Sequence, residues 1–144
     1  MSDARLDPVP PAHLRFVSQA GLRYSDVDWQ GHVNNAVYAA LFEQGRATFL
    51  TGLPTPPLAA DRAVVLASLT IEFRRELHWP GTVDLRVGVR RIGRCSYALA
   101  QQMLQGDAVI ADADCAQVLI SRETRRAVPL SEAQRAALIP WILE

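Results

Sequence analysis

The stretch Y-S-D-V-D-W-Q-G-H-V-N-N, residues 24–35, gathers the side chains of this sequence that are best suited to chemistry. It contains two carboxylates, one imidazole and two carboxamides, and an apolar run over residues 36–42 follows it directly. Carboxylates and imidazoles serve as nucleophiles or general bases, and carboxamides donate and accept hydrogen bonds. This density of polar groups asks for either a structural or a chemical explanation.

Turn chemistry explains part of the stretch. Asp26 and Asp28 suit Asx turns, Gly31 suits a backbone position with positive φ, and Asn34 suits a helix N-cap. His32 could simply form hydrogen bonds with loop carbonyl groups. A turn and a cap require two or three such residues rather than six. We therefore expect Asp28 and His32 to have a chemical role in addition to any structural one.

The helix that follows supplies the second half of the candidate site. Residues 35–50 have helical length and composition, and the first N–H groups of a helix lack internal partners and carry partial positive charge. Such donors can stabilise the oxyanion that forms when an acyl carbonyl is attacked. Asp28 lies seven residues before Asn35, so it could reach the same carbonyl as nucleophile or as general base for water. The arrangement suits acyl transfer.

The elements that must position these residues form an α+β pattern. Tyr38, Leu41, Phe42, Gly45 and Phe49 share one helical face, and the many alanines predict a helix buried on most sides. A close approach to a sheet would explain the glycine in mid-helix. Alternating apolar and polar residues predict strands over 14–24, 68–73, 83–90, 95–104 and 109–121, with a short helix over 132–138. We predict a curved antiparallel sheet of about five strands wrapped around one long buried helix.

The order of elements predicts one folded unit. Residues 1–13 are proline-rich and are expected to form a flexible arm, and residues 14–144 a single domain.

Cys95 and Cys115 lie in strand-like segments. Their spacing does not exclude a disulfide, but we expect buried free thiols in a reducing compartment. A long apolar edge strand predicts pairing with a second copy of the chain.

Composition excludes several classes of protein. The formal net charge is +0, so no general attraction to nucleic acid or to an anionic membrane is expected. All 15 basic residues are arginine, which excludes a P-loop lysine or a Schiff-base lysine. No segment approaches the ~20 apolar residues that span a bilayer. The charged, proline-rich start does not look like a signal peptide, so we predict a cytoplasmic protein.

The sequence resembles a known family in these same residues. R-Y-S-D-V-D-W-Q-G-H-V-N-N-A-V-Y followed by F-E-Q-G-R is similar to the signature of hot-dog-fold acyl thioesterases of the 4-hydroxybenzoyl-CoA thioesterase-like group, and also to the D-x-D-x-x-x-H-V-N-N stretch of plant acyl-ACP thioesterases. R-I-G-R-C-S and T-R-R-A-V-P-L-S-E-A-Q-R resemble later parts of the family pattern. The resemblance implies an acyl-CoA thioesterase that needs no metal or redox cofactor. It also implies a site between two subunits, in a homodimer or a dimer of dimers.

The family pattern implies roles for individual residues. Asp28 matches the loop carboxylate that acts as nucleophile or base, and the backbone N–H of Asn35 matches the donor to the thioester oxygen. His32 and Asn34 match residues that orient water or the carboxylate. Glu43, eight residues beyond Asn35, matches a helix carboxylate that another branch of the fold uses instead.

Some positions leave alternatives open. Asp28 is favoured over Glu43, because the loop resembles the Asp28 branch more closely, and Glu43 is then expected to form an ion pair with Arg46 or another arginine. Gly45 stands where relatives commonly carry alanine. Trp29, which with Gly31 is expected to border the substrate, is bulky and could narrow the acyl pocket.

A second candidate group lies at a strand end. Arg90, Arg91 and Arg94 could form a solvated charged edge, or could bind the phosphates of coenzyme A, for which the guanidinium fork is suited. Ser96 could add a hydroxyl group to that site, as in the relatives that this turn resembles.

Other functions have less support. The sequence contains no G-x-S-x-G elbow, no zinc-ligand spacing, no dinucleotide-binding glycine pattern and no platform for stacking nucleic-acid bases. The rivals that remain are an acyl-ACP thioesterase and a non-catalytic protein that binds acyl-CoA in a hot-dog groove.

Overall fold

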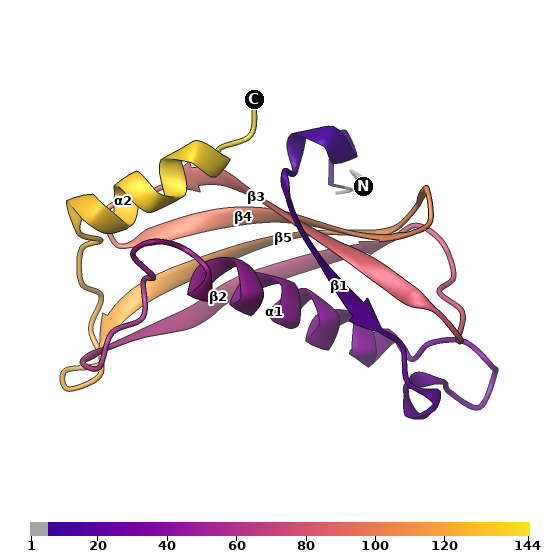
Figure 1. The fold of residues 1–144 in the computed structure, drawn as a ribbon. Coiled ribbons are helices and arrows are strands. Elements are labelled where there is room, and N and C mark those ends of the chain that lie inside the picture. Colours follow the sequence, from indigo (N-terminus) through magenta and orange to yellow (C-terminus); the bar gives the residue numbers. More distant parts are fainter. Residues whose placement is uncertain (1–5) are drawn as a thin grey trace, which may run out of the picture.

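The computed structural model describes residues 6–144, which form one five-stranded antiparallel sheet around one long helix (Figure 1). The order of strands across the sheet is β1-β3-β4-β5-β2. The strands are β1 (Phe16–Gly21), β2 (Arg62–Phe73), β3 (Thr82–Ile92), β4 (Ser96–Gln105) and β5 (Ala108–Ser121). The predicted α+β architecture, a curved sheet wrapped around one helix, is confirmed.

The helices are α1 (Asn35–Thr51) and α2 (Glu132–Leu138), with short 3₁₀ helices at η1 (Pro11–His13), η2 (Tyr24–Asp26) and η3 (Ile139–Trp141). Helix α1 begins at the predicted residue, and Gly52 is its C-cap. Helix α2 has a capping box in which Ser131 and Gln134 each bond to the other's backbone N–H. Leu138 of α2 joins Phe49 of α1 in one core cluster, so α2 closes the sheet beyond the C-terminus of α1.

One face of α1 packs on the sheet. Its buried residues include all five that the sequence placed on one face: Tyr38, Leu41, Phe42, Gly45 and Phe49. The prediction that the helix is buried on most sides is wrong, because on the opposite face Ala36, Ala40 and Ala47 are exposed and Ala39 is only half-buried. A single sheet can cover only one side of a helix, and within residues 6–144 no second layer lies over the other side.

Gly45 marks the closest approach of α1 to the sheet. A Cβ atom added there would lie 3.2 Å from Leu85 Cβ and 3.4 Å from Gln101 Nε2. Gln101 also donates from Nε2 to the carbonyl oxygen of Phe42 over 2.9 Å. The predicted close approach of helix and sheet is therefore confirmed, and glycine is the residue that permits it.

The face of the sheet opposite α1 carries the part of the N-terminal arm that the structure describes. Arg74 Nη2 donates to the carbonyl oxygen of Leu6 over 2.9 Å, Leu6 N–H donates to Glu72, and Gln102 donates to the carbonyl oxygen of Val9. Residues 6–13 thus lie along the sheet, whereas residues 1–5 of the predicted arm lie outside the described residues. No helix within residues 6–144 is long and apolar enough to cross a membrane.

Candidate active site

Residues 26–34 form a small hairpin that leads into α1. Val27 and Val33 form an antiparallel bridge, and Asp28 N–H donates to the carbonyl oxygen of His32 over 2.7 Å. Gly31 has a φ of 84°, a conformation that favours glycine, and its N–H donates to the carbonyl oxygen of Asp28 over 3.1 Å. The predicted turn role of Gly31 is confirmed.

Asp28 holds the tip of this hairpin with one carboxylate oxygen. Its Oδ1 accepts hydrogen bonds from the backbone N–H groups of Gln30 and His32, at 2.9 Å and 3.1 Å. Oδ2 has no hydrogen-bond partner among residues 6–144. The side chain is half-buried. One oxygen therefore fixes the carboxylate, and the other is free to accept a proton or to attack a carbon atom.

Asp26 anchors the start of the hairpin. It is 3% exposed, and Arg23 bonds to it through its backbone N–H at 2.7 Å and through its guanidinium at 3.0 Å. Burial alone would raise the pKa of Asp26, but these hydrogen bonds and the nearby charge of Arg23 outweigh it, so the pKa lies below its ordinary value. The first acid of the D-x-D pair is structural.

The N-terminus of α1 lies at the base of the hairpin. Asn34 caps the helix, since its Oδ1 accepts from Ala36 N–H over 3.0 Å, and its own N–H donates to the carbonyl oxygen of Asp26 over 2.8 Å. The N–H of Asn35 donates to no acceptor within residues 6–144. The sequence predicts a dry site at this helix end, but Asn34, Asn35 and Ala36 are exposed, because no part of residues 6–144 covers that side of α1.

His32 faces a carboxylate that sequence reasoning missed. Its Nε2 lies 3.5 Å from Glu76 Oε1, and His78 Nε2 lies 3.4 Å from the other oxygen of Glu76. The segment that carries Glu76 is held beside the hairpin, because Val33 N–H donates to the carbonyl oxygen of Leu77, a fully buried residue. The order of the strands could have predicted this contact, because the β1–α1 and β2–β3 connections lie at the same end of the sheet (Figure 1).

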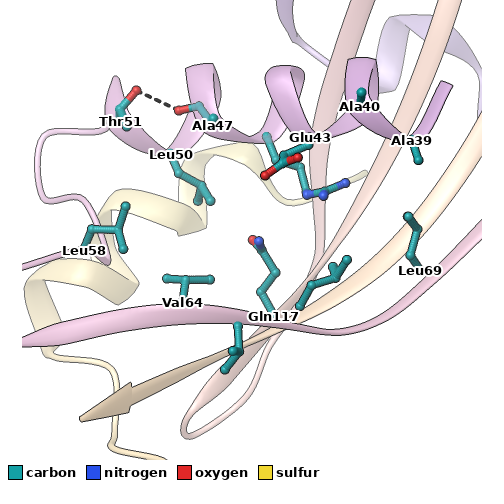
Figure 2. Close-up of a pocket in the computed structure, with 13 residues that line it drawn as sticks. Ala39, Ala40, Glu43, Ala47, Leu50, Thr51, Leu58, Val64, Leu69 and Gln117 are labelled. Carbon is teal, nitrogen blue, oxygen red and sulfur yellow. Dashed lines mark hydrogen bonds between the residues drawn. The ribbon is translucent and has the colours of Figure 1, made fainter. Parts of the chain in front are cut away.

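Glu43 lies in a different setting from Asp28. It is exposed on α1 and lines a cavity of about 550 Å³ between α1 and β2 (Figure 2). The predicted ion pair of Glu43 with Arg46 or another arginine is wrong: within residues 6–144, neither Glu43 nor Arg46 lies within 4.0 Å of an oppositely charged side chain. Arg46 turns inward instead and donates from Nη1 to Gln101 Oε1 over 3.0 Å. Sequence spacing cannot show this, because Gln101 comes from β4.

The arginine group of the β3–β4 turn lies at the other end of the sheet, beside α2 (Figure 1). Arg90 Nε donates to Asp114 Oδ1 over 2.9 Å, so this guanidinium is paired with a carboxylate of β5. Arg91 and Arg94 are exposed, and Ser96 begins β4. Within one chain, the structure does not bring these residues to Asp28.

Trp29 does not narrow a pocket of this chain, because its side chain is 91% exposed at the hairpin tip. Tyr24 and Trp79 lie at the same end of the molecule, where their rings meet edge to face with centroids 5.3 Å apart. Sequence reasoning did not single out Trp79. The hairpin end of the molecule therefore exposes three large aromatic side chains.

Comparison with solved structures shows the same fold in other proteins. The PA5185 protein from Pseudomonas aeruginosa superimposes with a TM-score of 0.82 at 20% identity, covering 90% of this chain and 92% of that chain. A predicted thioesterase from Bacillus stearothermophilus gives 0.81 at 24% identity, covering 90% and 97%. A 1,4-dihydroxy-2-naphthoyl-CoA thioesterase from Synechocystis gives 0.75 at 16% identity, covering 86% and 95%.

No curated protein matches the chain in a sequence search. The model of a protein family, described as the thioesterase-like superfamily, matches residues 22–138. This match spans the hairpin, α1, four of the strands and α2, which is most of the chain. Together with the five-stranded sheet around α1, it identifies the hot-dog fold, and the chain belongs to the thioesterase-like superfamily.

Proposed function

We propose that this protein hydrolyses an acyl-CoA thioester to a carboxylic acid and free coenzyme A. The observation that carries the proposal is that the hairpin with the free carboxylate oxygen of Asp28 leads directly into the N-terminus of α1, where the backbone N–H of Asn35 has no acceptor within residues 6–144. In the reaction, a water oxygen bonds to the thioester carbon, the C–S bond breaks, and the proton from water passes to the thiolate. Membership of the thioesterase-like superfamily supports this chemistry.

The backbone N–H of Asn35 is the proposed oxyanion donor. It belongs to the first residue of a 17-residue helix, so the partial positive charge of the helix end adds to its hydrogen bond. Asn34 already satisfies the N–H of Ala36. The Asn35 donor thus remains available for the carbonyl oxygen of the substrate.

Asp28 is the proposed general base or nucleophile. The two bonds to Oδ1 hold its carboxylate still, and Oδ2 is open. His32 belongs to the same hairpin, and its imidazole beside Glu76 is suited to orient the attacking water. Glu43 is the alternative base, since it lines the large cavity next to α1.

A second subunit would complete this site. Strand β2 is an open edge of the sheet with exposed Val65, Leu66 and Phe73, and the uncovered face of α1 lies beside it. Pairing of two β2 strands in antiparallel fashion would cover both surfaces, in a homodimer or a dimer of dimers. It would also reverse the ends of the sheet, so that the partner's arginine turn approaches the first chain's hairpin and could bind coenzyme A phosphates.

The test is thiol release from short-chain, long-chain and aromatic acyl-CoA esters by the wild type, Asp28→Asn and Glu43→Gln. We expect Asp28→Asn to lower kcat by about 10²- to 10⁴-fold, the usual contribution of a general base. Asp107→Asn, an exposed aspartate in the β4–β5 turn, is the matched control and should keep full activity. Circular dichroism confirms that each variant is folded.

Other outcomes would redirect the proposal. Loss of activity in Glu43→Gln alone would assign the chemistry to α1 rather than to the hairpin. Binding of acyl-CoA without hydrolysis by the wild type would favour the non-catalytic binding protein. Hydrolysis only of esters of acyl carrier protein would move the substrate to that carrier.

A further inference from the structure

The cavity between α1 and β2 has an apolar wall and a polar floor (Figure 2). Its volume of about 550 Å³ falls in the range of small-molecule sites. Alanine, valine and leucine side chains of α1 and β2 form the wall, and the polar residues that line the cavity are Glu43, Arg46, Thr51 and Gln117. An alkyl chain suits the wall, so the question is what the polar groups bind.

Arg46 is a buried cation with incomplete pairing. The residue is only 4% exposed, and no carboxylate of the described chain lies within 4.0 Å of it. Nη1 donates to Gln101, and Nε is buried with no hydrogen-bond partner. Because a buried unpaired charge is costly, an anion that reached Nη2 through the cavity would be bound strongly.

Gln117 brings a second donor to the same floor. It is 9% exposed on β5, and Figure 2 shows its amide pointing from the strand toward α1. Its Oε1 is buried without a partner, so no bond holds the amide in this orientation, and rotation about its last side-chain bond can direct the NH₂ donor to the same place. Tyr97, its cross-strand neighbour on β4, also has a buried hydroxyl without a partner. Arg46 and Gln117 therefore place unpaired polar atoms at the floor of the cavity, which Tyr97 itself does not line.

The donors decide the chemistry of the ligand. A guanidinium and a primary amide both offer N–H groups, and a carboxylate accepts from both at once. Glu43 also lines this cavity, but it lies on the exposed side of α1, whereas Arg46 is buried against the sheet. The anionic group must therefore lie at the deep end, with an apolar chain leading to it.

We propose that this cavity binds the acyl part of the substrate, and that Arg46 and Gln117 bind a carboxylate at the far end of that acyl group. The substrate class is the monothioester of a dicarboxylic acid. The hydrolysis of this ester rests on the proposed function, whereas the recognition of its carboxylate does not. A neutral acyl chain of the same length would leave Arg46 without a counter-ion, so the two kinds of chain are discriminated.

The experiment compares matched pairs of CoA esters that differ only in the terminal group: adipoyl with hexanoyl, suberoyl with octanoyl, and sebacoyl with decanoyl. We expect at least one dicarboxylic ester to exceed its partner in kcat/KM by on the order of 10- to 100-fold, as for a charged hydrogen bond. Arg46→Met should reduce this ratio of kcat/KM values to about one, and Arg46→Lys should keep part of the preference for the dicarboxylic ester. Arg122→Met, which changes an exposed arginine outside the cavity, should leave the ratio intact.

Gln117→Leu keeps the experiment decisive if Arg46→Met does not fold, because it changes a neutral side chain of similar size. It should lower the same ratio. Equal kcat/KM within every pair for the wild type, or an unchanged ratio in a folded Arg46→Met or Gln117→Leu variant, would overturn the inference.

Direct binding separates this inference from the proposed hydrolysis. If the wild type hydrolyses no CoA ester, the proposed function fails, and the dissociation constants of suberate and octanoate are compared by calorimetry instead. Tighter binding of suberate by the wild type, lost in Gln117→Leu, would support carboxylate recognition on its own. Equal or undetectable binding of both acids would overturn it.

Discussion

The two acids of the D-x-D pair have the same side chain but different surroundings. Asp26 is buried, and Arg23 satisfies both of its oxygens. Asp28 is half-buried and uses only Oδ1 within the hairpin. Hydrogen bonding thus distinguishes an acid that uses both oxygens to hold a loop from an acid that keeps one oxygen free.

The depressed pKa of Asp26 predicts a stability that depends on pH. The folded chain holds this carboxylate ionised to lower pH than the unfolded chain does, so its contribution is present above the unfolded-state pKa of about 4 and is lost as the pH falls through the folded-state value. Asp26→Asn should lower the free energy of unfolding at neutral pH by about 1–2 kcal/mol. Below about pH 4 its stability should depend less on pH than that of the wild type.

Urea unfolding between neutral and acidic pH measures both effects. Asp107→Asn, whose carboxylate is exposed, is the control and should follow the wild type. If the free energy of unfolding of Asp26→Asn changed with pH in parallel with that of the wild type, Asp26 would not be the source of the pH dependence.

The roles of residues that act within their own segment could be predicted from the sequence, whereas roles that depend on tertiary contacts could not. Gly31 and Asn34 act within a few residues of themselves, so spacing revealed their turn and cap roles. The expected Glu43–Arg46 pair failed because Arg46 binds a side chain of β4. Glu76 was missed because it reaches His32 only through the fold. The assignment of Asp28 as the reactive acid stays a prediction.

At the scale of elements, Gln101 ties the middle of α1 to the middle of the sheet. Its amide donates to the carbonyl oxygen of Phe42 and accepts from Arg46, one turn further along the helix. Gly45 lies between these two contacts, where the helix backbone meets Leu85. The three contacts fix the height and rotation of α1 over the sheet, and so the direction in which its N-terminus points.

Gly45→Ala should therefore destabilise the protein, although alanine is the better helix former by about 1 kcal/mol. The new Cβ would lie 3.2 Å from Leu85 Cβ, which belongs to a central strand and cannot move easily. Overpacking costs about 1–3 kcal/mol, so we expect a net loss of about 1 kcal/mol in urea unfolding. Gly21→Ala, where nothing lies within 4 Å, should be neutral. A Gly45→Ala variant as stable as the wild type would show that the sheet yields here.

Element boundaries show where sequence patterns stop being informative. The predicted strand over 68–73 is the second half of β2, which begins at Arg62. A register shift between Leu66 and Ser68 breaks the alternation there, so the first half lacks a strand pattern. The predicted strand over 14–24 is longer than β1, because the chain turns into η2 at Tyr24. The central strands β3, β4 and β5 begin and end within two residues of the predicted ranges, so their prediction is confirmed.

At the scale of the whole molecule, residues 6–144 leave one face of α1 and the edge strand β2 beside it uncovered. We expect a dimer through β2, and light scattering should give twice the mass of one chain. Val65→Lys places a charge on this edge and should shift the mass toward that of one chain. Val17→Lys, at a comparably exposed valine of the opposite edge strand β1, should leave the dimer intact. A wild type with the mass of one chain would contradict the proposed assembly.

The two cysteines differ in a way that makes this assembly measurable. Both are free; Cys95 is half-buried in the β3–β4 turn, whereas Cys115 is buried beneath α1, and burial raises the pKa of its thiol. A maleimide probe should therefore react first at Cys95, without any engineered cysteine. The chain has no lysine, so amine-reactive dyes cannot label an internal side chain. A spin label or fluorophore at Cys95 would give one reporter per subunit, at the end of the sheet far from the Asp28 hairpin, from which distances across the dimer can be read.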